Sequence, residues 1–364
     1  MKIVIFAGGS GRRLWPISRQ KSPKQFEPIL GDKSTLQLAV DRVFTTYGAD
    51  NIFLSTNELY KHIVREQLPA IDPTHVIGEP TRRDLAAAVG LAMAHLVATD
   101  PSAAEEPVAI IWGDSYLEEV PKFLHLLAIA EELLRDPNND ILFIGETPRF
   151  PNENLGWLAL GDQLGQFDAT PYYQYTSLTY RPALDVCQKM FAANSHVWNT
   201  GYFVTTPGFV QEMYALYQPT MWEKLSAIQT TIGKSDYPAT LRAIYPTIES
   251  ISFDDAVLTH VLPDRAIVLH GALGWSDPGS LYALKEAINP DPHSTVTLGN
   301  VIIENSQDSL VYNYQDDKLL VAIGLDGMIV VNTEDAVLVV HKDHIPLVKN
   351  VVNGLEGTNL ESFS

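Results

Sequence analysis

A glycine-rich turn near the N-terminus carries the residue types best suited to binding a phosphorylated substrate. The apolar run Ile3–Ala7 leads into Gly8-Gly9-Ser10-Gly11, and Arg12 and Arg13 follow. Because glycine has no Cβ, the backbone N–H groups of such a turn can approach an anion closely. Arg13 offers a planar, permanently charged fork, and Lys24 offers a mobile point charge. We therefore expect this segment to bind a triphosphate, the alternative being a tight turn with solvated cations.

Two familiar nucleotide-binding motifs do not fit this turn. A dinucleotide-binding fingerprint requires a third glycine where this chain has Leu14, and Pro16 soon stops any helix. A Walker A loop requires Lys and then Ser or Thr after its last glycine, where Arg12 stands. The later Gly233-Lys234-Ser235 lacks the first glycine of that motif, since Ile228 holds the position.

A carboxylate directly follows the most buried-looking apolar run, Pro107–Trp112. This residue is Asp114. Ligand sites in open α/β sheets lie at the carboxyl ends of strands, so we expect Asp114 to face the same crevice as the glycine turn. Mg²⁺ prefers carboxylate oxygens and keeps waters and phosphate oxygens as further ligands. Asp277, in Ser276-Asp277-Pro278-Gly279, is a second candidate, although a single aspartate in a loop is otherwise a turn cap.

The elements that would position these residues alternate between strands and helices up to about residue 285. The predicted strands are Ile3–Ala7, Asn51–Ser55, Val76–Ile77, Pro107–Trp112 and Asp140–Gly145. Four helices are predicted. Two begin after the caps Ser34 and Asp84, one contains Tyr60 to Leu68, and one spans Lys122–Leu134. This alternation predicts a Rossmann-like, doubly wound, mostly parallel sheet with helices on both faces.

The pattern changes at Asn289-Pro290-Asp291-Pro292, which reads as a linker. Six short β runs between residues 296 and 340 follow, separated by turns, and a helix is expected over Ile345–Val352. Regular short strands indicate a small β-helix-like domain, with a β meander as the alternative. We therefore predict a domain over residues 1–288 and a linker with a small β domain over 289–364. The polar run His341–His344 reads as a solvated turn.

Composition limits the partners of this 364-residue chain. It has 25 Lys and Arg against 44 Asp and Glu, a formal charge of −19, so nucleic acid and membrane surfaces are poor default partners. A lone Cys187 excludes an internal disulfide and a cysteine-based zinc site. The N-terminal apolar run is too short for a signal peptide, and no stretch approaches the ~20 apolar residues of a membrane span. We expect a cytoplasmic protein.

The segment Gly8–Phe26, GGSGRRLWPISRQKSPKQF, resembles the signature of the sugar-phosphate nucleotidylyltransferases, and most of all those that transfer GMP to mannose 1-phosphate. Leu-Trp-Pro after the arginines and Pro-Lys-Gln-Phe downstream are the specific parts. Further stretches are similar to that family as far as the C-terminus: Glu79-Pro80 with Arg83-Asp84, Trp198–Phe203, Ile251–Asp254, Gly274–Ser280 and Gly299–Val352.

This resemblance implies a Mg²⁺-dependent transfer of GMP from GTP to mannose 1-phosphate, which yields GDP-mannose and pyrophosphate. It assigns Asp114 and Asp277 to the metal. Arg13 would stabilise charge on the leaving pyrophosphate, and Lys24 would stabilise charge at the α-phosphorus. The nucleotide would lie on the turn formed by Gly8, Gly9, Ser10, Gly11 and Arg12. No protein nucleophile is required for this chemistry.

Base and sugar recognition are expected elsewhere in the chain. Guanine presents adjacent N–H donors that Glu79 or Asp84 could accept, although Asp84 could equally be only a helix cap. The family's sugar loop corresponds here to Leu155–Leu158. Its Glu-Lys-Pro corresponds to Tyr180-Arg181-Pro182, which keeps the cation and loses the carboxylate. The expected sugar-phosphate contacts are Gly156, Tyr180, Arg181, Asn199 and Gly201.

These departures leave two alternatives open. One is a nucleotidylyltransferase for another hexose 1-phosphate or another nucleotide. The other is a non-catalytic regulatory homologue that binds a sugar nucleotide.

A homo-oligomer through the C-terminal domain is also expected.

Overall fold

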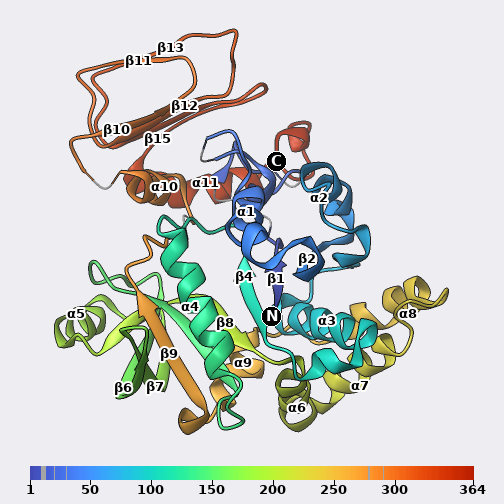
Figure 1. The fold of residues 1–364 in the computed structure, drawn as a ribbon. Coiled ribbons are helices and arrows are strands. Elements are labelled where there is room, and N and C mark those ends of the chain that lie inside the picture. The colour runs from blue at the N-terminus through green and yellow to red at the C-terminus, as the bar shows by residue number, and fades with distance from the viewer. Residues whose placement is uncertain (10–13, 20, 30, 278, 290) are drawn as a thin grey trace. The chain divides into compact units, whose positions relative to one another are not determined.

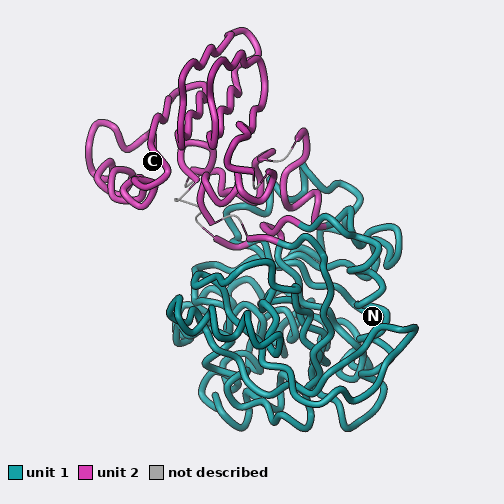
Figure 2. Tube along the Cα trace, turned by 90° about the vertical axis from the view of Figure 1, so that its left-hand side faces the viewer, with its two compact units in different colours: residues 1–7, 40–112, 117–275 teal, residues 8–39, 113–116, 276–364 magenta. Residues whose placement is uncertain are grey.

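The computed structural model describes residues 1–9, 14–19, 21–29, 31–277, 279–289 and 291–364. The chain divides into two compact units, each built from separate stretches of sequence (Figure 2). Unit 1 comprises residues 1–7, 40–112 and 117–275, and unit 2 comprises residues 8–39, 113–116 and 276–364. The division into domains at residue 289 stays a prediction.

Unit 1 is built on a nine-stranded sheet of order β3-β2-β1-β4-β8-β5-β9-β7-β6. Its strands are β1 (Lys2–Phe6), β2 (Ile52–Asn57), β3 (Val76–Glu79), β4 (Val108–Trp112), β5 (Ile141–Glu146), β6 (Gly156–Phe167), β7 (Thr170–Tyr180), β8 (His196–Thr205) and β9 (Ala266–Gly271). Strands β3, β2, β1 and β4 are parallel neighbours, as are β5 and β9. β8 and β7 run against their neighbours in this sheet. The predicted mostly parallel sheet is confirmed.

Helices cover both faces of this sheet (Figure 1). Adjacent residues of a strand point to opposite faces, and β8 shows what lies on each. Tyr202 packs on Phe123 of α4 (Val120–Leu133), with ring centroids 5.4 Å apart. Its neighbour Phe203 stacks on Phe253 of α9 (Phe253–Ala256) at 5.3 Å. The sheet is therefore doubly wound, as expected from the strand–helix alternation.

The remaining helices of unit 1 are α2 (Lys61–Gln67), α3 (Asp84–Thr99), α5 (Leu184–Ala193), α6 (Pro207–Tyr217), α7 (Pro219–Gln229) and α8 (Tyr237–Ile244). The predictions of α2 and α3 are confirmed, whereas the other four helices were not predicted. Helices α6 to α9 lie between β8 and β9 in the chain, and α6, α7 and α9 bury apolar residues with α3 in one core cluster. The expectation of a loop at Leu155–Leu158 is wrong, because β6 begins at Gly156 and pairs with both β7 and β8.

Helix α1 (Thr35–Tyr47) begins with the expected cap. The Gln37 backbone N–H donates to Ser34 Oγ at 3.2 Å, and the Ser34 N–H donates to Gln37 Oε1 at 2.9 Å. This reciprocal pair satisfies two N–H groups at the start of the helix. The cap predicted at Ser34 is confirmed.

Unit 2 contains stacked parallel strands that distinguish a β-helix from a meander. One sheet has the order β10 (Thr295–Leu298), β12 (Ser309–Asn313), β14 (Met328–Asn332), β15 (Val337–His341), and the other pairs β11 (Val301–Glu304) with β13 (Leu320–Ile323). Leu310 pairs with Ile329 and Val301 with Leu320 in parallel, and Asn332 donates to Asn313, 19 residues earlier, at 2.8 Å. A meander would pair these strands antiparallel. The predicted β-helix-like domain is confirmed, and β15 returns antiparallel on β14.

Two helices complete unit 2: α10 (Leu281–Ile288) and α11 (Ile345–Asn353). Leu281 and Leu284 of α10 lie in one core cluster with Leu310 and Ile329 of the β-helix. The same cluster includes Leu14, Ile17 and Ile29, which lie on both sides of Lys24 in the sequence. The signature segment and the β-helix therefore share an apolar core. Within the described residues, no helix is both long and apolar enough to span a membrane.

We expect Gly90→Val, in the buried middle of α3, to lower the free energy of unfolding by about 1–3 kcal/mol, the usual cost of overpacking. A Cβ at Gly90 would overlap Leu225 and lie 2.8 Å from the ring of Tyr214, whose hydroxyl donates to Ala86 O. Urea denaturation measures the change. Ala128→Val, at an exposed position of α4, is the matched control. Equal stability of the two variants would contradict the tight contact between α3 and α7.

Candidate active site

The centre of the candidate site is a lysine that binds two carboxylates from distant parts of the chain. Lys24 Nζ lies 2.8 Å from Asp114 Oδ2 and 3.3 Å from Asp277 Oδ1. All three residues belong to unit 2. Their side chains are 12%, 28% and 46% exposed, in the order Lys24, Asp114, Asp277. The structure thus brings together the two predicted metal ligands and one of the two predicted catalytic cations.

Backbone hydrogen bonds hold the two acidic segments against each other. Tyr116 N–H donates to Ser276 O at 2.9 Å, and Ser276 N–H donates to Tyr116 O at 3.1 Å. This antiparallel bridge joins the segment after β4 to the segment before α10. Because Asp114 is two residues from Tyr116 and Asp277 follows Ser276, the bridge fixes the distance between their backbones.

Lys24 begins a short 3-10 turn, Lys24–Phe26, whose other residues anchor it. Gln25 and Phe26 are buried, and the Phe26 N–H donates to Pro23 O at 2.9 Å. The buried pair leaves Lys24 as the residue of this turn that reaches the acidic segments.

The three charges of the cluster shift one another's titration. Burial lowers the pKa of the Lys24 ammonium, but Asp114 and Asp277 more than reverse this, so its pKa lies above the usual value. Burial raises the pKa of the Asp114 carboxyl, and the charge of Asp277 adds to this rise while Lys24 opposes it. Two neighbouring carboxylates thus depend on a cation between them to stay ionised together.

The donor set of this cluster fits a hard divalent cation. One ammonium nitrogen lies within 3.3 Å of an oxygen from each aspartate, so the two carboxylates converge on one point. Mg²⁺ is commonly held by one or two carboxylates, with waters and substrate phosphates completing its coordination. Across the described ranges, no group of three or more His, Cys, Asp and Glu residues is arranged to hold a metal. A metal at Asp114 and Asp277 would therefore need ligands from outside the chain.

The glycine turn is described only in part. Gly8 and Gly9 follow β1, and Gly9 has a φ of 144°, which residues with a side chain rarely adopt. The predicted residues Ser10, Gly11, Arg12 and Arg13 lie outside the described residues. Gly8 and Asp114 come two residues after the ends of β1 and β4, which are parallel neighbours in the sheet. Both segments thus leave the sheet at the same edge.

The two residues predicted to recognise guanine lie in unit 1. Glu79 ends β3, and its Oε2 accepts a hydrogen bond from the Tyr245 hydroxyl at 2.6 Å. Burial raises the pKa of the Glu79 carboxyl to about 7, although Tyr245 and Arg82 act in the opposite direction.

Asp84 also lies at a helix start, but not in the expected way. The structure has Arg83 as the N-cap of α3, with no side-chain cap, and Asp84 as its first residue. Asp84 has a left-handed φ of 60°, and its carboxylate accepts from the adjacent Leu85 N–H at 2.8 Å. The predicted N-cap role of Asp84 is therefore wrong in position, since its carboxylate bonds the N–H of the next residue in the first turn.

Three of the predicted sugar-phosphate residues are brought together on adjacent strands. Gly156 of β6 is paired with Tyr180 of β7 on one side and with Asn199 of β8 on the other. Asn199 Oδ1 accepts from Gly201 N–H at 2.9 Å. Gly201 has a φ of 76°, and a Cβ there would overlap Trp112 of β4, so this position requires glycine.

Arg181 extends the same group beyond the end of β7. Its guanidinium lies over the Tyr180 ring, 5.1 Å from the centroid, and its Nε donates to Asn154 O at 3.3 Å. The Tyr180 side chain is 66% exposed. The predicted sugar residues thus lie side by side in unit 1, where Tyr180 and Arg181 are exposed and Gly156 is buried between β7 and β8.

One buried carboxylate of unit 1 was not predicted as a functional residue. Glu146 ends β5 and is 1% exposed, and its Oε2 accepts from Leu273 N–H at 2.9 Å and from Trp275 N–H at 3.2 Å. Burial raises the pKa of the Glu146 carboxyl, and these hydrogen bonds oppose the rise. Glu146 thus orders the chain two residues before Asp277. Glu146 could have been found by the pattern that identified Asp114, namely a carboxylate at the carboxyl end of a buried apolar run.

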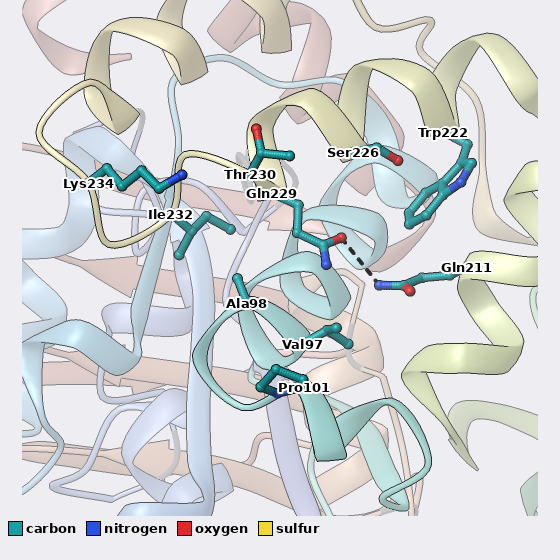
Figure 3. Close-up of a pocket in the computed structure, with 10 residues that line it drawn as sticks. All are labelled: Val97, Ala98, Pro101, Gln211, Trp222, Ser226, Gln229, Thr230, Ile232 and Lys234. Atoms are coloured by element: carbon teal, nitrogen blue, oxygen red, sulfur yellow. Dashed lines mark hydrogen bonds between the residues drawn. The ribbon is translucent and has the colours of Figure 1, made fainter.

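A separate hollow in unit 1 contains none of the predicted residues. It has a volume of about 480 Å³ and lies between the C-terminal end of α3, helices α6 and α7, and the loop after α7 (Figure 3). Trp222 and Val97 line it, Lys234 stands at its edge, and Gln211 donates to Gln229 at 3.4 Å across it. We assign this hollow no role in the chemistry.

Comparison with known proteins defines the class. A family model described as nucleotidyl transferase matches residues 2–294, and one described as the mannose-phosphate isomerase/GMP-like β-helix domain matches residues 299–355. The chain belongs to the nucleotidyl transferase family and is a nucleotidyltransferase. The resemblance drawn from Gly8–Phe26 is confirmed.

Several relatives are similar along nearly the whole chain. A mannose-1-phosphate guanylyltransferase of Salmonella typhimurium, RfbM, is 29% identical over 99% of this chain and 73% of its own length. The alginate biosynthesis protein AlgA of Pseudomonas aeruginosa is 29% identical over 97% of this chain and 72% of its own length. A solved structure from Thermus thermophilus, described as a mannose-1-phosphate geranyltransferase, superposes with a TM-score of 0.84 at 26% identity, covering 98% of this chain and 99% of that one.

We expect Glu79→Gln to flatten part of the pH dependence of stability. An unfolded chain titrates glutamate near pH ~4.3, while folding raises the pKa of Glu79 to about 7. Between these values the folded state binds the extra proton, so stability falls as pH rises from about 4.5 to about 7. Melting temperatures of wild type and variant across this range measure the difference.

Tyr245→Phe is the matched test, because it should raise the pKa of Glu79 further and so enlarge the pH dependence of stability that Glu79→Gln removes. It removes a hydrogen bond that favours the carboxylate, so the fall in stability should extend above pH 7. Identical pH profiles for wild type and both variants would contradict the raised pKa of Glu79.

Proposed function

We propose that the protein transfers GMP from GTP to mannose 1-phosphate, giving GDP-mannose and pyrophosphate, with Mg²⁺ as cofactor. The observation that carries the proposal is the convergence of Lys24, Asp114 and Asp277. The choice of mannose and guanine is supported by the relatives whose descriptions name mannose-1-phosphate guanylyltransferase.

The main task of this reaction is to bring two anions together. A sugar phosphate must attack the α-phosphorus of a triphosphate in line with the departing pyrophosphate, so positioning and charge neutralisation dominate. Bound at Asp114 and Asp277, Mg²⁺ would neutralise phosphate oxygens and help to orient them. Lys24 carries three N–H donors, two of which point to the carboxylates, and the third suits an α-phosphate oxygen. Arg13, assigned by the resemblance, would stabilise the pyrophosphate.

The residues of β6, β7 and β8 suit the sugar phosphate. Arg181 offers a guanidinium for the phosphate, and the Asn199 amide, opposite Gly156 on the adjacent strand, offers hydrogen bonds for sugar hydroxyls. The Glu79 carboxylate, oriented by Tyr245, would accept the adjacent N–H donors of guanine.

A second candidate keeps the chemistry and changes the sugar. Tyr180 stands where the family pattern has a glutamate that binds sugar hydroxyls. A phenol both donates and accepts one hydrogen bond, whereas a carboxylate only accepts, so another hexose 1-phosphate would suit this position equally. A non-catalytic regulatory role would not require the intact cluster of Lys24 with both aspartates.

Purified protein with GTP, mannose 1-phosphate and Mg²⁺ should release pyrophosphate, and a panel of other nucleoside triphosphates and hexose 1-phosphates tests the choice. Asp114→Asn should lower the rate on the order of 100-fold or more, because it removes charge from the metal site. Asp326→Asn, an exposed turn residue of the β-helix, is the control. A panel that stays inert throughout, or full activity of Asp114→Asn, would contradict the proposal.

Arg181→Ala should raise the KM for the sugar phosphate about 10- to 100-fold, the usual effect of losing a charge-assisted hydrogen bond, and leave the KM for GTP nearly unchanged. Lys189→Ala on α5 is the matched control, since Lys189 is an exposed cation paired only with Asp185 in the described structure. Steady-state kinetics with each substrate varied in turn measure the split. A rise confined to the KM for GTP would contradict the assignment of Arg181 to the sugar-phosphate site.

A further inference from the structure

A buried carboxylate of the β-helix is bound by two residues of the helix that follows Asp277. Asp308 is 4% exposed, and its two oxygens accept from the Tyr282 hydroxyl at 3.0 and 3.1 Å. Lys285 Nζ lies 2.8 Å from Asp308 Oδ1 and is itself completely buried. Tyr282 and Lys285 lie one turn apart on α10, so Asp308 binds two side chains on one face of that helix.

A third donor completes the group from the end of the β-helix. Lys342 Nζ lies 2.6 Å from Asp308 Oδ2 and 5.2 Å from the centre of the Tyr282 ring. The expectation of a solvated turn at His341–His344 is therefore wrong for Lys342, which is engaged in an ion pair. Lys285 also donates to Asp291 O at 2.8 Å, which ties the end of α10 to the chain that enters the β-helix.

The segment that leads into α10 carries Asp277, one of the two residues proposed to bind the metal. Ser280 caps α10, its Oγ accepting from Ala283 N–H at 3.2 Å, and Asp277 precedes this cap by three residues. Because so short a stretch of chain joins them, the position of α10 limits where the Asp277 backbone can lie. On its other side, Asp277 is limited by the bridge between Ser276 and Tyr116.

Apolar packing by itself does not fix where α10 sits along the β-helix. Leu281 and Leu284 pack against Leu310 and Ile329, and such contacts tolerate small displacements. The buried, hydrogen-bonded pair of Asp308 and Lys285 is different, because displacing it leaves unpaired charges out of water. Asp308 even adopts a left-handed φ of 46° at its corner of the β-helix. This group selects one position for α10.

We infer that Asp308 is a positioning residue for the metal site, acting through Tyr282 and Lys285 of α10 to hold Asp277 opposite Asp114. The β-helix is then part of the catalytic apparatus rather than an independent appendage. This inference rests on the proposed function, in that it takes Asp114 and Asp277 as the residues that bind Mg²⁺.

The test measures metal affinity apart from turnover, on the full chain. Mn²⁺ is the probe, and its binding is followed by the electron paramagnetic resonance of the unbound ion with no substrates present. Mutating a residue that hydrogen-bonds to a metal ligand typically changes metal affinity ~10- to 100-fold. Asp308 acts less directly, because it contacts α10 rather than Asp277 itself. We therefore expect Asp308→Asn to weaken Mn²⁺ binding roughly three- to tenfold, and to raise the Mg²⁺ concentration for half-maximal activity by the same factor.

Tyr282→Phe keeps the ring, removes one donor to Asp308 and should shift Mn²⁺ binding in the same direction by a smaller factor. This variant carries the test if Asp308→Asn does not fold. Asp326→Asn is the matched control, because Asp326 accepts from Gln307 at an exposed corner of the β-helix and has no bond to α10 in the described structure. Its Mn²⁺ affinity should equal that of wild type. The KM for mannose 1-phosphate should stay unchanged in all three variants.

Three outcomes decide the inference. A folded Asp308→Asn or Tyr282→Phe protein with wild-type Mn²⁺ affinity, whatever its melting temperature, would overturn the positioning role. Weaker Mn²⁺ binding in these variants, with Asp326→Asn unchanged, would support it. Wild-type protein that binds Mn²⁺ and releases no pyrophosphate from any substrate pair would contradict the proposed function alone, since the Mn²⁺ titrations would still decide the role of Asp308.

Discussion

One ammonium group between two carboxylates is the interaction on which the rest of the site depends. Asp114 and Asp277 both lie close to Lys24, and their like charges repel. Lys24 compensates one of these two charges, so the cluster stays negative and attracts a further cation. Each charge comes from a different segment of the chain. The fold must therefore bring three segments together before the site exists.

In unit 2, the segments that bear Lys24 and Asp277 share one apolar core with the β-helix, and the bridge between Tyr116 and Ser276 joins the segment of Asp114 to them. Leu14 and Ile29 flank the segment that bears Lys24, and they lie in the same apolar cluster as Leu281 of α10 and Leu310 of the β-helix. The chain enters unit 2 at the carboxyl ends of β1 and β4, where ligand sites of open α/β sheets are usual. The small β domain thus shares its core with the segments that bear Lys24 and Asp277, and its Asp308 binds the helix that follows Asp277.

The residues proposed to bind phosphate and those proposed to bind the sugar relate differently to the family pattern. Lys24, Asp114 and Asp277 match that pattern, as the proposed reaction requires, because both of its substrates carry phosphate whose charge must be neutralised. The sugar residues depart at Tyr180, where a phenol replaces a carboxylate. Gly156 and Asn199 nonetheless meet across adjacent strands. Differences in substrate choice within the family are therefore expected at β6, β7 and β8, which belong to a different unit from the charged cluster.

The sequence by itself determined the local features: the buried strands β1 and β4, the cap at Ser34, the repeated strands of the β-helix, and a carboxylate after β4. These follow from periodicity and backbone preferences within a few residues. The half-exposed hairpin β6–β7 and helices α6 to α9 escaped prediction, since their patterns mix polar and apolar residues. Only the tertiary structure decided which distant groups meet, as with Glu79 and Tyr245, 166 residues apart, and Lys285 with Asp308. A hydrophobic pattern states which face of an element is buried, whereas the partner of a buried charge depends on which elements pack against that face.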